Sequence, residues 1–172
     1  MKTAVSVFVI VAALALQTSL AGLLAGGSIA VNLVLVAVVY LALSYGAVTG
    51  LLAGMLGGIA QDALAGGIVG LGGMTKTLIG FAVGVLGAQF NLSTTVPRMV
   101  MFVAATFVHQ LVFESLNAMI GGRQFSPQWT ATLVQALTNG LIGVLVFLVI
   151  ENGPDTLQRR RARRTSLSKR RF

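Results

Sequence analysis

Residues 29–64 read IAVNLVLVAVVYLALSYGAVTGLLAGMLGGIAQDAL, and this stretch decides the fold class. Its apolar residues run continuously instead of alternating with polar ones, which favours helices and argues against the strands of a transmembrane barrel. Asp62 is the single charged residue in the stretch. Its two apolar runs, 29–44 and 46–64, are joined only through Ser44-Tyr45-Gly46, so we expect a tight antiparallel helical hairpin.

The whole chain of 172 residues has the composition of an integral membrane protein. Hydrophobic residues make up 56% and charged residues 9%, against about 25% charged residues in a typical soluble domain. The mean hydropathy is +0.90. A soluble domain of this size exposes a large surface that needs polar cover, and so few charges cannot supply it. Soluble, disordered and fibrous classes are therefore excluded, and an all-α membrane protein is predicted.

Six stretches fit transmembrane helices, each near the roughly 20 residues needed to cross the hydrocarbon. They cover approximately residues 3–24, 29–44, 46–64, 71–90, 97–120 and 128–150. We therefore expect a bundle of six transmembrane helices within residues 1–150. Residues 151–172 follow as a basic, flexible tail, because Asn152-Gly153-Pro154 is expected to break the last helix.

The positions of lysine and arginine predict how the bundle is oriented. If the C-terminus is cytoplasmic, six spans place the N-terminus on the same side. Lys2, Arg98 and the eight basic residues after residue 150 then lie in the cytoplasm. Only Lys76 and Arg123 lie toward the other side. The distribution predicts a multi-pass protein with both termini cytoplasmic.

The first apolar run has a second interpretation. Met1-Lys2, the apolar stretch and Ser19-Leu20-Ala21 also fit a cleavable signal peptide. Five further spans already require an inserted chain, and cleavage would place the new N-terminus outside. We therefore favour an uncleaved first helix.

Side chains that commonly serve in catalysis or metal binding are scarce in this sequence. The chain has no cysteine, one histidine and four carboxylates, which excludes thiolate chemistry and disfavours a multi-ligand metal centre. It also lacks a GxxxxGK[ST] phosphate loop, a GxSxG elbow and an HExxH helix. We expect a non-enzymatic protein without a cofactor.

Small residues recur at four-residue spacing along the third and fourth predicted spans. Such a repeat makes a smooth helix face that a neighbouring backbone can approach closely. We expect tight packing between the two spans and treat both faces as structural or partner-binding candidates. The residues are Gly50, Gly54 and Gly58 in the third span, and Gly80 and Gly84 in the fourth.

Asp62 and Lys76 flank the glycine-rich connection between those two spans. Asp62 falls about four turns into its helix, where an unpaired charge is costly. We expect an Asp62–Lys76 pair, or a shared hydrogen-bond network that fixes the turn. Two independently solvated charges remain the alternative.

Polar side chains form a stripe on each of the last two spans, at spacings that keep each stripe on one helix face. Glu114 is mid-span, and an ionisable group there is a functional candidate by default. His109 lies about 140° around the helix from Glu114 and is a poor partner for it. We favour an internal polar seam over a small-solute pocket. The candidate residues are Gln110, Glu114, Asn117, Gln135 and Asn139.

The C-terminal region is strongly basic. It includes Arg159, Arg160, Arg161, Arg163 and Arg164. A basic run can bind nucleic acid, but one that follows directly after a span is more simply explained by attraction to anionic cytoplasmic lipids. We therefore expect anionic lipids, and no nucleic acid, as partners of the tail.

The order of motifs in residues 10–90 resembles the rod shape-determining protein MreD family. The first span ends in Leu16-Gln17-Thr18, and the second opens with Val31-Asn32-Leu33. A glycine-lined hairpin then leads to Gln61-Asp62, followed by a glycine-rich turn and Lys76. Gln17 and Asn32 thereby become candidates for structural or partner roles. The chain departs from the pattern at Val31, where the family carries proline.

The resemblance implies a function that composition does not. MreD-like proteins are non-enzymatic parts of the complex that elongates the lateral cell wall in the bacterial inner membrane. The implied partners are a membrane-anchored MreC-like protein, a RodA-type glycan polymerase with its transpeptidase, and the actin-like MreB. The implied fold is similar to the substrate-binding membrane subunits of energy-coupling-factor transporters. This similarity supplies the alternative, a vitamin-binding subunit with its pocket between the last two spans.

Overall fold

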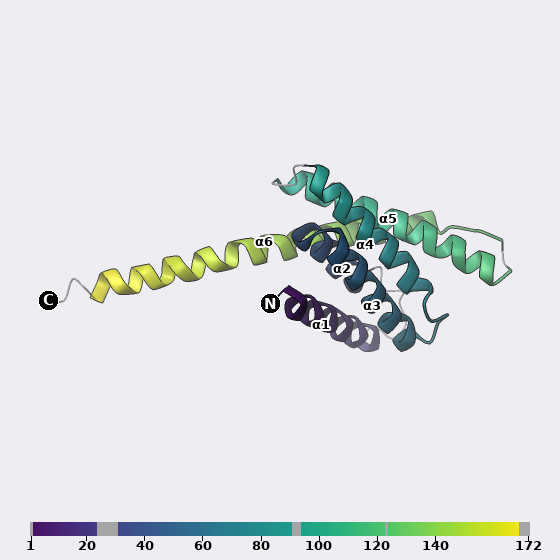
Figure 1. Cartoon of the computed structure of the whole chain (residues 1–172), viewed down its shortest axis with the longest axis horizontal. Coiled ribbons are helices and arrows are strands. Elements are labelled where there is room, and N and C mark those ends of the chain that lie inside the picture. Colours follow the sequence, from purple (N-terminus) through teal and green to yellow (C-terminus); the bar gives the residue numbers. More distant parts are fainter. Residues whose placement is uncertain (1, 24–30, 91–93, 123, 169–172) are drawn as a thin grey trace.

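The computed structural model of the chain describes residues 2–23, 31–90, 94–122 and 124–168, with side chains for 3–20, 31–90, 94–122 and 124–150. These residues form helices without strands, as the apolar runs predicted (Figure 1). The helices are α1 (Lys2–Leu23), α2 (Leu33–Tyr45), α3 (Ala47–Ala65), α4 (Leu71–Gln89), α5 (Thr95–Ile120) and α6 (Trp129–Ser168).

Five of these helices are long and apolar enough to cross a membrane, whereas α2 is not. With 13 residues, α2 is about 20 Å long, against about 30 Å of hydrocarbon. Every residue from Val34 to Ala42 is buried. The expectation of six full-length spans is therefore corrected to five such helices and one short central helix. The apolar run 29–44 is apolar because protein surrounds α2 on all sides.

The predicted antiparallel hairpin between α2 and α3 is confirmed. Gly46 alone separates the two helices, and its φ of 92° suits glycine because it has no Cβ. A Cβ on Gly50 would collide with Ala42, and one on Gly57 would lie 3.1 Å from Val34. The start of α3 therefore packs against the end of α2, and α3 runs back along it.

Helix α6 is longer than expected. It continues to Ser168, so the expected break at Asn152-Gly153-Pro154 is wrong. Once a helix exists, each added residue contributes a hydrogen bond without a new nucleation cost. The residues after Pro154 are rich in arginine, which is a good helix former. The side chains of the five candidate arginines of the tail lie outside the described residues.

The bundle has a tight centre and a loosely attached edge. Phe147 of α6 packs edge-on against Tyr40 of α2, with ring centroids 4.8 Å apart, and the guanidinium of Arg98 lies over the same ring at 4.7 Å. Helix α1 lies at the periphery (Figure 1). Ile10 is buried, while Phe8 is 73% exposed. Most of the α1 surface is therefore free to face lipid or another protein.

Candidate functional site

Polar side chains from three other helices converge on the beginning of α2. The Asn32 side chain caps its own helix by accepting a hydrogen bond from the Leu35 N–H at 3.0 Å. The backbone N–H of Asn32 donates to Asn139 Oδ1 of α6 at 3.0 Å. The N–H of Val34 donates to Gln17 Oε1 of α1 at 3.2 Å. These bonds satisfy three backbone donors at one helix end.

This arrangement has a clear physical cause. The first N–H groups of any helix lack partners within the helix, and α2 begins in the protein interior, where water does not supply them. In a membrane-embedded region such groups are tolerated only where other parts of the protein satisfy them. Asn139 also donates through Nδ2 to Thr106 Oγ1 of α5 at 3.3 Å. We call Gln17, Asn32, Thr106 and Asn139 the α2 cap, because together they join α1, α2, α5 and α6.

The predicted polar seam is only partly assembled in this geometry. Asn139 makes the interhelical bonds just described, whereas Gln110 Nε2 donates along its own helix to Glu114 Oε1 at 2.8 Å. Asn117 is exposed and Gln135 is half-buried. Sequence reasoning placed Asn139 in a seam with these residues but did not connect it with Gln17 or Asn32. Those three positions are far apart in the chain, and helical periodicity relates only residues of one helix.

A second polar centre lies where α3 passes into α4. Asp62 Oδ2 accepts hydrogen bonds from the backbone N–H groups of Gly70 at 2.9 Å, Gly72 at 2.8 Å and Gly73 at 3.2 Å. Gly70 precedes α4 in a left-handed conformation with φ 100° and supplies no side-chain cap. Asp62 therefore caps α4 from the preceding helix, and its negative charge suits a helix N-terminus.

Lys76 lies one turn further along α4 and is only 2% exposed. The Asp62 charge attracts it electrostatically. The described hydrogen bonds of Asp62 go to the backbone of the turn and not to Lys76, so the expected Asp62–Lys76 pair or shared network stays a prediction. Independent solvation does not describe either residue, because Asp62 is also buried, at 8% exposed.

The glycine faces of α3 and α4 pack directly against each other. A Cβ on Gly58 would lie 2.5 Å from Gly73 Cα, and Cβ atoms on Gly50 and Gly54 would collide with backbone atoms of α4. The same holds in reverse for Gly80 against Gly50 and for Gly84 against Ala47. The predicted close packing of these two spans is present. Both faces are buried in the contact between α3 and α4 and are not accessible to a partner.

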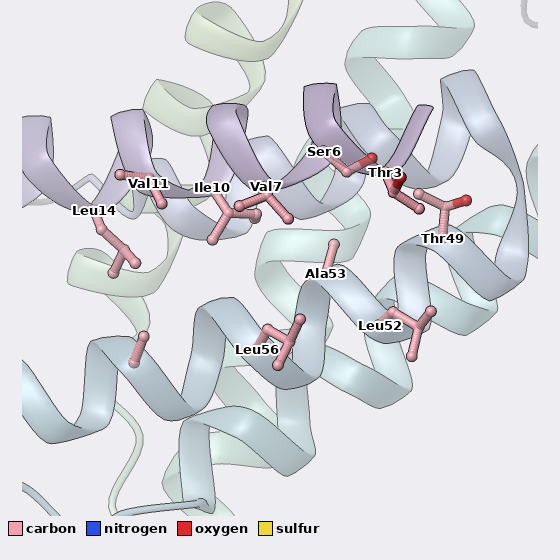
Figure 2. Close-up of a pocket in the computed structure, with 11 residues that line it drawn as sticks. Thr3, Ser6, Val7, Ile10, Val11, Leu14, Thr49, Leu52, Ala53 and Leu56 are labelled. Carbon is pink, nitrogen blue, oxygen red and sulfur yellow. The ribbon is translucent and has the colours of Figure 1, made fainter. Parts of the chain in front are cut away.

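A lateral groove of about 310 Å³ lies between α1 and α3. Figure 2 shows its walls, with Val7, Ile10 and Leu14 on α1 facing Leu52 and Leu56 on α3. The remaining lining residues are Thr3, Ser6, Val11, Thr49, Ala53 and Ala60. The lining is almost wholly apolar, and the hydroxyl groups of Thr3, Ser6 and Thr49 lie at one end of it (Figure 2). Sequence reasoning missed this groove because neither helix carries an unusual motif along it.

Of the two described cavities, the second borders the last two spans, and its lining residues are all apolar. The second cavity is a shallow apolar surface lined by α5 residues such as Met99 and Phe107, with Leu133 of α6. The described residues contain no group of three or more His, Cys, Asp or Glu side chains that could hold a metal ion. The vitamin-carrier alternative therefore gains no support from this geometry.

Comparison with known proteins identifies a family for most of the chain. Residues 1–152 match the family model described as rod shape-determining protein MreD. No curated protein and no solved structure gave a significant match, so the similarity to energy-coupling-factor transporter subunits is not shown.

Proposed function

The chain belongs to the MreD family of rod shape-determining proteins, and on that premise we propose that it is a non-enzymatic scaffold of the cell-wall elongation complex. Family membership assigns it to shape determination and to a membrane. The proposal adds that it binds the membrane span of an MreC-like protein and so supports lateral peptidoglycan synthesis. A RodA-type polymerase with its transpeptidase, and MreB, would then join the same complex.

The α1–α3 groove is the observation that carries this proposal. A partner helix cannot use the glycine faces, because α3 and α4 already occupy them. The groove instead lies between two helices that are each long enough to span the membrane. In lipid, association depends on close packing rather than on a hydrophobic driving force, and a concave apolar surface offers more packing contacts than a convex helix. We therefore place the MreC-like span in the groove.

The proposed location is the bacterial inner membrane with both termini in the cytoplasm. The excess of lysine and arginine at the chain ends supports this orientation. Although α2 is short, it runs antiparallel to α3. It would therefore carry the chain back toward the cytoplasmic side, where α3 begins. The basic residues after residue 150 would then meet the anionic lipids of the cytoplasmic leaflet.

Two matched variants test the groove. Ala60 lines it, whereas Ala63 lies on the same helix, is exposed and does not line it. A phenylalanine at position 60 fills the groove, and a phenylalanine at position 63 adds the same bulk elsewhere. Each variant is expressed in a rod-shaped bacterium that lacks its own copy of the protein, and the MreC-like partner is then co-purified.

We expect the wild type and Ala63→Phe to restore rod shape and retain the partner, and Ala60→Phe to do neither while reaching the membrane in equal amount. If Ala60→Phe retains the partner, the groove is not the docking site. If the wild-type protein purifies with a small molecule or an ATPase and without an MreC-like protein, the scaffold function itself is wrong.

A further inference from the structure

His109, the single histidine of the chain, is a buried group that the proposed function does not use. It is 3% exposed and lies on α5 facing α4, where its Nε2 is 3.3 Å from Thr75 Oγ1. The ring also stacks on Phe113 of its own helix, with centroids 6.0 Å apart. The Thr75–His109 bond is a polar link between the α3–α4 hairpin and α5.

The hydrogen bonds around this link determine which protons it can carry. Thr75 Oγ1 donates to the carbonyl oxygen of Gly72 at 3.1 Å, and a hydroxyl has only one hydrogen to donate. The imidazole must therefore donate through Nε2–H, with Thr75 as acceptor. Nδ1 is then unprotonated, and it is buried without a hydrogen-bond partner among the described residues. A proton on Nδ1 would create a buried donor with no acceptor, which is costly.

The surrounding charges also oppose a protonated ring. Lys76 of α4 follows Thr75, is buried, and acts electrostatically on His109. Asp62 caps α4. Glu114 accepts from Gln110 through Oε1, while its buried Oε2 has no hydrogen-bond partner among the described residues, and it lies about 140° around α5 from His109.

The other elements packed against α5 supply no compensating charge. Helix α2 and the Trp129–Ile150 part of α6 contain no charged residue, and their only ionisable side chains are the two tyrosines of α2. On α5 itself, Arg98 is a cation located three turns from His109.

We propose that His109 is a proton-sensitive tie between α4 and α5. With a neutral ring, the Nε2–H bond to Thr75 holds α5 against the α3–α4 hairpin. When the ring is protonated, an unpaired donor and a second positive charge beside Lys76 separate them. Acidification therefore weakens the contact between α5 and the α3–α4 hairpin.

The sign of the effect follows from linkage. An imidazole in the unfolded chain takes up its proton near pH 6.5, whereas in the folded chain a proton on Nδ1 has no acceptor among the described residues. Stability is therefore fully present above about pH 6.5 and falls as the pH drops further. The unfolding equilibrium constant rises about tenfold for each pH unit below that point.

The first test is nitrogen NMR of the full chain in detergent with ¹⁵N-labelled histidine and no histidine tag. Because the chain has one histidine, the imidazole signals need no assignment by mutation. We expect a neutral ring protonated at Nε2 at pH 8 that stays neutral at pH 6. A ring protonated at Nδ1 alone, or an imidazolium already dominant at pH 6.5, overturns the proposal without requiring any variant to fold.

The second test compares unfolding at pH 7.5 and pH 5.5, followed by the fluorescence of Trp129, the one tryptophan of the chain. His109→Gln keeps an N–H donor for Thr75 but cannot titrate, so its unfolding should not change between the two pH values. Asn117→Gln changes an exposed residue of the same helix without adding or removing a titratable group; it is the matched control and should keep the wild-type loss of about tenfold. A His109→Gln protein that loses stability with acid as the wild type does overturns the proposal.

Discussion

Replacing Asn139 with leucine tests whether the α2 cap holds the bundle together. The change preserves side-chain size approximately, but it removes the acceptor of the Asn32 N–H and the donor to Thr106. The cap was inferred from hydrogen bonds between side chains and backbone, so a variant that removes two of them without opening a large cavity isolates that contribution.

Two contributions determine how much stability the variant loses. Interhelical hydrogen bonds in membrane proteins average about 0.6 kcal/mol, so losing two costs about 1.2 kcal/mol. A buried N–H left without a partner adds a penalty of about 1 to 3 kcal/mol. We expect a loss of about 2 to 4 kcal/mol in the free energy of unfolding. At roughly 2 to 4 °C per kcal/mol for a chain of this size, a loss of 2 kcal/mol lowers Tm by about 4 to 8 °C.

Thr138 provides the matched control. Its hydroxyl donates at 2.7 Å to the Val134 carbonyl oxygen of the same helix and makes no bond to another helix in the described structure. Thr138→Val should therefore change stability by less than about 0.5 kcal/mol. Both variants are measured in the same detergent by thermal unfolding. If Asn139→Leu is no less stable than Thr138→Val, the cap does not stabilise the start of α2, and the reasoning is refuted.

Two further predictions concern the α3–α4 hairpin. Asp62→Ala should lower the free energy of unfolding by about 2 to 3 kcal/mol, because it leaves charge-assisted hydrogen bonds unmade. Adding Lys76→Met should recover part of that loss in thermal unfolding. If the effects of the two substitutions are merely additive, the two residues are not coupled. Gly54→Ala places a Cβ 2.7 Å from the Thr77 backbone nitrogen and should cost at least about 1 kcal/mol despite the better helix propensity of alanine. Gly67→Ala, which meets nothing within 4 Å, should be nearly neutral in the same assay.

The long helices could be predicted from the sequence because each is a continuous apolar run ended by glycine, proline or polar residues. The hairpin at Gly46 could be predicted for the same reason. The length of α2 could not, since an apolar run looks the same whether lipid or protein surrounds it. The structure makes the distinction, because Leu35 and Val38 on α2 are fully buried, whereas Phe8 on α1, also in an apolar run, is exposed.

The candidate polar residues were found individually, but their partners were not. Asp62 and Asn139 are conspicuous because polar groups are rare in these spans. Their main partners are backbone N–H groups, which every residue except proline carries and which no sequence pattern reveals. His109 was considered only against Glu114 on its own helix. Its partner Thr75 lies on another helix, where helical spacing cannot relate the two.

The two buried polar centres perform the same physical task, and this bears on function. Asp62 satisfies the start of α4, while Asn32, Gln17 and Asn139 satisfy the start of α2. Hydrogen-bonding capacity that is used to close helix ends is not available to hold a polar solute. What remains open at the α1–α3 edge is the groove, whose mainly apolar lining contains no charged side chain and can pack against another helix. A rigid interior with an open apolar groove between two long helices is an arrangement that suits a membrane scaffold.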